Sequence, residues 1–283
     1  MSVANDVIGI IFAVLLILVN IPQYWKIISH HTSLGFSPWF FMLGNIASFW
    51  VLLVTGIFYI NSIWTCRGVG ECAESFIGFG LVVEQWILYM LLYLLYLWYL
   101  PRGTEPYWER FPGMSRRLVC RLSFIVSNIV SFGGLVGVLL ILNKHKWRNP
   151  DVLSDVTAYI SFMESVVTIC FLTHYLPQIW EIYKLRDPGS LSLITLTLTS
   201  LGSFLWGIFL SIQGNFVLTN GQVSSPHVWL PYIAVGIMQL IILVMCVYYD
   251  RRKMMIARDL SDEERIILEE GGMIALEEVR DIE

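Results

Sequence analysis

Charged residues are scarce in this chain of 283 residues. They make up 14% of it, against about 25% in an average soluble chain. Hydrophobic residues make up 56%, and the mean hydropathy is +0.66. A monomer of this size cannot hide so much apolar surface from water, so the sequence predicts an integral membrane protein. The chain also lacks metal-ligand spacings, nucleophile motifs and phosphate-binding loops, so the sequence predicts neither an enzyme nor a cofactor.

The acidic residues that are present gather at the C-terminal end. Residues 259–283 hold ten acidic side chains and two basic ones, whereas the rest of the chain holds 12 acids and 16 bases. An acidic, polar tail therefore follows a mildly basic membrane body, and nothing in this balance indicates nucleic-acid binding. We divide the chain into a membrane domain at 1–250 and a cytosolic tail at 251–283.

Long apolar segments organise the membrane domain. A hydrocarbon core of about 30 Å needs about 20 mostly apolar residues per helix. Seven segments meet this requirement: about 7–28, 38–59, 76–100, 119–142, 156–180, 191–212 and 228–249. Asp6 takes the place of the basic region that a cleavable signal peptide requires. With seven spans, a lumenal or extracellular N-terminus leaves 14 bases in the cytosolic segments and four on the other side, so we predict a cytosolic C-terminus.

An internal repeat relates the two halves of this domain. Residues 21–27 (Ile-Pro-Gln-Tyr-Trp-Lys-Ile) recur at 176–182 as Leu-Pro-Gln-Ile-Trp-Glu-Ile, an offset of 155 that also pairs Ser48 with Ser203. Repeat one then covers about 7–100, the linker helix 119–142, and repeat two 156–249. This is an all-α, 3+1+3 arrangement of parallel three-helix repeats. Substrate sites in such carriers lie at the repeat interface near the midplane.

Each repeat carries one Pro-Gln pair near the cytosolic end of its first helix, with a serine 14 residues after the glutamine. The pairs are Pro22-Gln23 and Pro177-Gln178, and the serines are Ser37 and Ser192. In these features the chain resembles the PQ-loop proteins, which include cystinosin, the lysosomal and vacuolar exporters of cationic amino acids and, more distantly, the SWEET carriers and the KDEL receptor. The resemblance implies that the pairs act as hinges for alternating access. The second loop differs from the family pattern because Ser190 stands where the first loop has Gly35.

The physical properties of these residues allow two interpretations of the prolines. Proline cannot donate a backbone hydrogen bond, so Pro22 frees the carbonyl of Leu18 and Pro177 that of Thr173. Each proline either kinks its helix or simply ends it at the membrane surface. Ser37 and Ser192 are typical residues for the start of the following helices.

Ionisable residues within a span are costly and are treated as functional by default. Glu84 and Glu164 both lie well inside predicted spans, and the offset of 155 pairs Glu84 with Gln239 and Asn45 with Ser200. A hydrated, negatively biased pocket is therefore predicted from Glu84, Gln85, Gln239, Asn45, Ser200 and Glu164. Alternatively, the two acids are protonated and hydrogen-bonded between helices. Glu84 is the preferred proton carrier because Gln239 mimics its protonated form.

Several further residues have local interpretations. Cys66 and Cys72 flank a loop predicted to face the oxidising side, where a disulfide is expected, whereas Cys120, Cys170 and Cys246 are predicted to be apolar fillers. The aromatic residues late in span three, Tyr93 and Tyr96 among them, are interpreted as a belt at the membrane surface. Alternatively, Gln85, Tyr89 and Tyr96, at spacings of four and seven, form one wall of a cavity. Ile267 and Leu268 form either a dileucine-like signal for a sorting adaptor or part of a short amphipathic helix.

The sequence supports two classes of function. The first is a carrier of a small polar solute, an amino acid in the first instance, coupled to protons and resident in a vacuolar or lysosome-like membrane, with another endomembrane or the plasma membrane as alternatives. Its partners would be membrane lipids, the solute and the proton. The second is a non-transporting protein of the same fold that acts in trafficking, cargo retrieval or lipid distribution.

Overall fold

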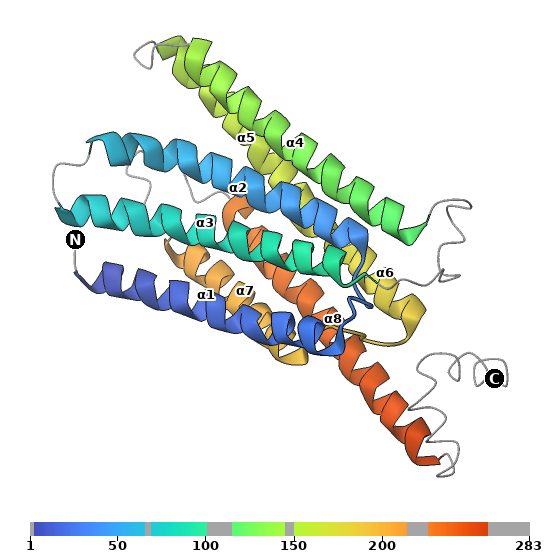
Figure 1. The fold of residues 1–283 in the computed structure, drawn as a ribbon. Helices are drawn as coiled ribbons and strands as arrows, with labels where there is room; N and C mark the ends of the chain where they lie inside the picture. Colours follow the sequence, from blue (N-terminus) through green and yellow to red (C-terminus); the bar gives the residue numbers. More distant parts are fainter. Residues whose placement is uncertain (1–2, 66–68, 101–114, 145–149, 214–225, 260–283) are drawn as a thin grey trace.

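The structure is a computed structural model that describes residues 3–65, 69–100, 115–144, 150–213 and 226–259 (Figure 1). Its helices are α1 (Val3–His30), α2 (Pro38–Thr65), α3 (Val69–Trp98), α4 (Arg116–Lys144), α5 (Pro150–Thr173), α6 (Tyr175–Leu185), α7 (Leu193–Gln213) and α8 (Pro226–Asp259). One residue, His174, separates α5 from α6, so this pair fills the place of one span. Within the described ranges, six helical segments are long and apolar enough to cross a membrane, and α7 supplies a shorter apolar one. The prediction of an all-helical membrane protein with seven helical segments is confirmed.

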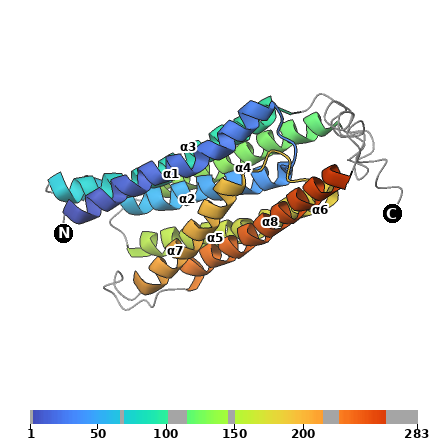
Figure 2. The same cartoon turned by 90° about the horizontal axis from the view of Figure 1, so that it is seen from below.

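The helices form two equivalent triplets joined by α4. In the first triplet, α3 contacts α1 and α2; in the second, α8 contacts α5, α6 and α7. The triplets meet where α1 contacts α7 and where α2 contacts α5 and α6, and the offset of 155 relates these two interfaces to each other. Figure 1 shows α1, α3, α5 with α6, and α8 running in one direction, and Figure 2 shows α1 with α3 across the bundle from α6 with α8. The repeats are therefore parallel, with α4 packed mainly against α2.

Two serines mark the points where helices begin. Helix α2 begins at Pro38, directly after Ser37, and α7 begins at Leu193, directly after Ser192. The backbone N–H of Thr195 donates to the hydroxyl of Ser192 at 3.3 Å. This bond satisfies one of the free N–H groups of the first turn, so the predicted helix starts are confirmed.

The two prolines lie inside helices. Helix α1 runs through Pro22, and α6 runs through Pro177, each for eight further residues to His30 and Leu185. Neither proline ends its helix, which removes the simpler of the two interpretations. The helix is interrupted in the second repeat at His174. This residue directly follows Thr173, whose carbonyl lacks its helical donor because of Pro177. At the equivalent position of the first repeat, Val19 lies within the continuous helix α1. The second repeat is therefore interrupted at this position and the first is not, and the hinge role of both prolines stays a prediction.

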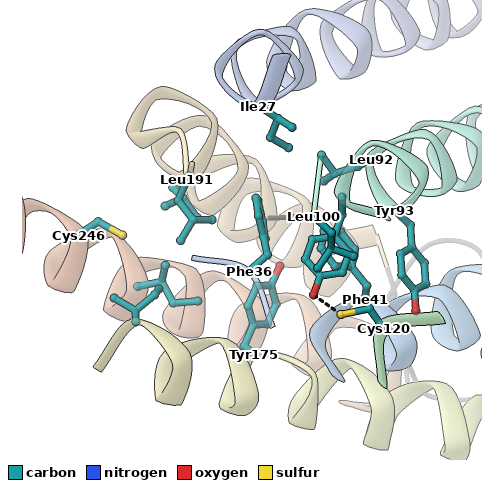
Figure 3. Close-up of a cluster of buried hydrophobic side chains, with 14 residues drawn as sticks. Ile27, Phe36, Phe41, Leu92, Tyr93, Leu100, Cys120, Tyr175, Leu191 and Cys246 are labelled. Carbon is teal, nitrogen blue, oxygen red and sulfur yellow. Dashed lines mark hydrogen bonds between the residues drawn. The ribbon is translucent and has the colours of Figure 1, made fainter. Parts of the chain in front are cut away.

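A core of buried side chains joins both repeats and α4 at one end of the bundle (Figure 3). Tyr93 and Tyr96 are fully buried in it, beside Phe41 and Cys120. The rings of Phe41 and Tyr93 stack with their centroids 5.0 Å apart, and the hydroxyl of Tyr96 lies 3.0 Å from Cys120 Sγ. The prediction that these two tyrosines form a surface belt is wrong, because both are buried in the core where the repeats meet. The alternative that Tyr96 belongs to a cavity wall stays a prediction.

Candidate functional site

The glutamine of each Pro-Gln pair binds the loop of the other repeat. The side-chain amide of Gln23 donates to the carbonyl oxygen of Ser190 at 2.8 Å, and the backbone N–H of Ser192 donates to Gln23 Oε1 at 2.7 Å. The glutamine side chain is buried, with 3% of its surface exposed. Both polar ends of one buried amide are therefore satisfied by a loop 167 to 169 residues away in the sequence.

The second glutamine, in repeat two, makes the same two bonds to the loop of repeat one. The amide of Gln178 donates to the carbonyl oxygen of Gly35, and the backbone N–H of Ser37 donates to Gln178 Oε1 at 2.9 Å. The offset of 155 converts Gly35 and Ser37 into Ser190 and Ser192. We call these four hydrogen bonds the glutamine clamps. They connect the helix that carries each proline to the opposite repeat.

The two clamped loops also contact each other directly. The backbone N–H and the hydroxyl of Ser190 both donate to the carbonyl oxygen of Leu34, at 2.8 and 2.7 Å. Gly35 and Gly189 have φ values of +94° and +55°, and a Cβ on Gly35 would lie 2.7 Å from the carbonyl oxygen of Pro188. Glycine is required where one backbone approaches another so closely. Loop two thus has its left-handed glycine one position before Ser190, which accounts for its departure from the family pattern.

Lys26 and Glu181 occupy equivalent positions beside the clamps but carry opposite charges, so the two repeats differ here. In the first repeat, Lys26 donates to the carbonyl oxygen of Leu191 at 2.6 Å. The equivalent of Lys26 is Glu181, which has no proton to donate to the equivalent carbonyl of Phe36. Arg116 of α4 takes over this role: it donates to the Phe36 oxygen at 3.3 Å and to Glu181 Oε1 at 3.3 Å. The linker helix is therefore tied to the second repeat by an ion pair whose side chains are 8% and 9% exposed.

The repeat-related pair of Glu84 and Gln239 is asymmetric. Gln239 is buried, donates to the hydroxyl of Tyr175 at 2.6 Å and accepts a bond from Ser203 at 3.2 Å. Glu84 Oε1 is also buried, but it has no hydrogen-bond partner among the described residues. Leaving a buried polar atom unpaired is costly. Among the described residues, Glu84 is thus the member of the pair whose side chain has an oxygen without a hydrogen-bond donor.

The other residues proposed for the pocket lie at separate interfaces. Asn45 donates to Ser127 of α4 at 3.1 Å, and Ser200 donates to the carbonyl oxygen of Gly236 in α8 at 3.0 Å. The side chains of Gln85 and Glu164 are exposed on the bundle. The structure brings Ser200 and Gln239 together along the α7–α8 interface, but Asn45 lies at the α2–α4 interface. A single pocket formed by all six residues stays a prediction.

The remaining predictions concern the cysteines and the C-terminal tail. Cys120, Cys170 and Cys246 are buried free thiols, as expected for fillers. Cys66, the side chain of Cys72, and the tail with Ile267 and Leu268 lie outside the described residues. Within the part of the chain that the structure describes, no group of three His, Cys, Asp or Glu side chains is arranged to hold a metal ion.

Sequence reasoning missed Lys26, Glu181 and Arg116. A signal for the first two was present, because the offset of 155 aligns a lysine with a glutamate inside otherwise matching heptapeptides. Such a reversal of charge within a repeat indicates that a compensating base lies nearby. Nothing in the sequence singles out Arg116 among its neighbours, because its role depends on where α4 packs.

Comparison with known protein families supports the same architecture. The pattern of the PQ loop repeat family matches the chain twice, at residues 4–62 and 159–219. The chain therefore belongs to the PQ-loop repeat family and contains two of its repeats. Proteins of this family are generally transporters and not enzymes. Searches of curated proteins and of solved structures found no match to the chain.

Proposed function

We propose that this PQ-loop membrane protein transports a small polar solute, an amino acid in the first instance, by proton-coupled alternating access. The observation that carries the proposal is the reciprocal arrangement of the glutamine clamps. Each Pro-Gln pair joins a helix position that lacks one backbone hydrogen bond to a contact with the opposite repeat. A change of angle at either proline is thereby coupled to the contact that holds the two repeats together.

In the proposed mechanism, the clamps hold one end of the transport pathway closed. Opening this end requires Gln23 to leave the loop at 190–192 and Gln178 to leave the loop at 35–37. Each hydrogen bond contributes about 0.5–1.5 kcal/mol net. Four such bonds represent a free-energy difference of a few kcal/mol between the closed and open conformations, which differential binding of solute and proton to the two conformations can offset.

Glu84 is the proposed proton carrier. A carboxyl within a span prefers its neutral form, and Glu84 has a buried oxygen with no described partner. Glu84→Gln fixes the protonated state, so the variant should exchange solute but lose accumulation driven by a pH gradient. If Glu84→Gln retains this accumulation and Glu164→Gln loses it, the assignment is reversed. Full accumulation in both variants contradicts proton coupling through these acids.

Uptake into proteoliposomes tests the proposed function. The purified full chain is reconstituted and offered a panel of amino acids and sugars, with and without an imposed pH gradient. We expect at least one amino acid to accumulate above its external concentration when the gradient is present. Absence of uptake for every member of the panel would favour the second class of function, a PQ-loop protein in trafficking, cargo retrieval or lipid distribution.

Charge distribution supports a proposed orientation. The C-terminal end of α8 carries Arg251, Arg252 and Lys253, and Lys/Arg-rich ends remain on the cytosolic side of membranes. With this end in the cytosol, the glutamine clamps also lie near the cytosolic surface. A vacuolar or lysosome-like membrane is the proposed compartment, since the tail contains the dileucine-like pair.

A further inference from the structure

A shallow apolar groove lies between α6 and α8. It has a volume of about 360 Å³ and is lined by Leu176, Ile179, Trp180, Tyr183 and Met245. Both of its walls belong to segments apolar and long enough to cross a membrane, 158–185 and 230–256. In a bilayer, therefore, hydrocarbon chains and not water contact this groove.

Basic side chains lie at the end of the groove where α6 ends. The amine of Lys184 lies 6.0 Å from the ring centroid of Trp180, which places a cation at the rim. Arg252 follows Met245 by seven residues, which is two turns further along the same face of α8.

The repeat provides an internal comparison for this surface. The positions equivalent to the five lining residues in repeat one, 155 residues earlier, are again apolar or aromatic: Ile21, Tyr24, Trp25, Ile28 and Met90. The residue equivalent to Lys184 is Ser29, and the residue equivalent to Arg252 is Leu97. The apolar surface is thus common to both repeats, whereas the two cations belong only to the second. Facing lipid requires the shared apolar residues but does not account for the cations.

We propose that this groove binds an anionic phospholipid. One acyl chain occupies the apolar groove, and the lipid phosphate lies between the side chains of Lys184 and Arg252. The charges are complementary, and an alkyl chain matches the shape and chemistry of the lining. Under the orientation proposed above, the site faces the cytosolic leaflet, where anionic lipids are enriched. The proposal does not depend on the transport activity.

Native mass spectrometry of the purified full chain tests the preference. The protein is titrated with phosphatidylserine and, separately, with phosphatidylcholine of identical acyl chains. A basic residue near the headgroup contributes roughly fivefold in affinity. We therefore expect phosphatidylserine to bind more tightly than phosphatidylcholine, and each of Lys184→Gln and Arg252→Gln to reduce this preference about fivefold.

Matched variants separate the groove from a general effect of charge. Arg251→Gln removes a base from the same end of α8 but from a different face, and it should preserve the preference. Leu176→Trp fills the groove while keeping both bases, and it should weaken phosphatidylserine binding; Ile21→Trp, at the equivalent place in repeat one, should not. Equal binding of the two lipids by the unmodified chain would overturn the proposal. It would also be overturned if Arg251→Gln abolished the preference while Lys184→Gln and Arg252→Gln retained it.

Discussion

At the scale of single residues, the amide of glutamine is the group that makes the clamps work. It offers a donor and an acceptor in fixed geometry, and both Gln23 and Gln178 use one to hold a loop carbonyl and the other to hold a loop N–H. A glutamate at either position could only accept, and a lysine could only donate. Pattern recognition locates these glutamines in the sequence, but it does not identify what they bind, because the partners belong to the opposite repeat.

The clamps lead to a prediction about stability. Gln23→Leu and Gln178→Leu preserve approximate size but leave a buried loop N–H and carbonyl unpaired, at a cost of about 1–3 kcal/mol per group. Thermal unfolding of the purified variants should show a lower midpoint for each, and a larger decrease for the double variant. Gln85→Leu, at an exposed position of α3, should leave the midpoint close to that of the unmodified protein. A double variant as stable as the unmodified protein would contradict the role of the clamps.

The reversed charge in the second repeat leads to another prediction. Glu181→Lys restores the lysine of the first repeat but places it against Arg116, so the single variant should be destabilised by about 3–5 kcal/mol. Adding Arg116→Leu removes the repulsion and allows the new lysine to donate to the carbonyl of Phe36, as Lys26 does to that of Leu191. The double variant should therefore unfold at a higher temperature than Glu181→Lys alone. If Arg116→Leu lowers its stability further, the two bases do not perform equivalent roles.

At the scale of elements, hydropathy and helix-start residues predict most of what the structure contains. The predicted segments 38–59 and 191–212 begin within two residues of α2 and α7, because Ser37-Pro38 and Ser192 are local signals. The segment 156–180 was less predictable, since it is divided at His174 into α5 and α6. Proline at 177 indicates a weakness in the helix, but the packing of His174 against Phe40, with ring centroids 5.2 Å apart, is a contact between repeats that local patterns do not encode.

The interrupted helix leads to a prediction about motion. Pro177→Ala restores a backbone N–H that can donate to Thr173, so α5 and α6 should merge and the protein should gain about 1–3 kcal/mol of stability. Exchange of solute across proteoliposome membranes should slow, because the hinge becomes stiffer. Pro231→Ala serves as the control, since this proline lies inside α8 without a following glutamine. Unchanged exchange in Pro177→Ala combined with Pro22→Ala would show that the prolines are not hinges.

At the scale of the whole molecule, the repeat determines the architecture, and departures from the repeat determine its chemistry. The offset of 155 predicts that the α1–α7 interface is equivalent to the contacts of α2 with α5 and α6, as the structure shows. It cannot predict that Glu84 has an oxygen without a partner among the described residues while Gln239 is satisfied, because these differences depend on side-chain neighbours from other helices. The pocket of six residues that includes Asn45, Glu84 and Gln239 was predicted from sequence positions alone and stays a prediction. In the structure, Asn45 donates to Ser127 of α4.

The proposed mechanism requires the two contacting loops to separate during each transport cycle. Cysteines introduced at Leu34 and Ser190, where a loop carbonyl and a loop hydroxyl lie 2.7 Å apart, would join the two repeats covalently at this point. The most direct measurement is the uptake, into proteoliposomes, of the solute identified by the panel, before oxidation, after oxidation and after subsequent reduction. The single variants Leu34→Cys and Ser190→Cys serve as controls for oxidation. We predict that oxidation of the double variant abolishes uptake and that reduction restores it, whereas continued uptake with the cross-link fully formed would contradict the account.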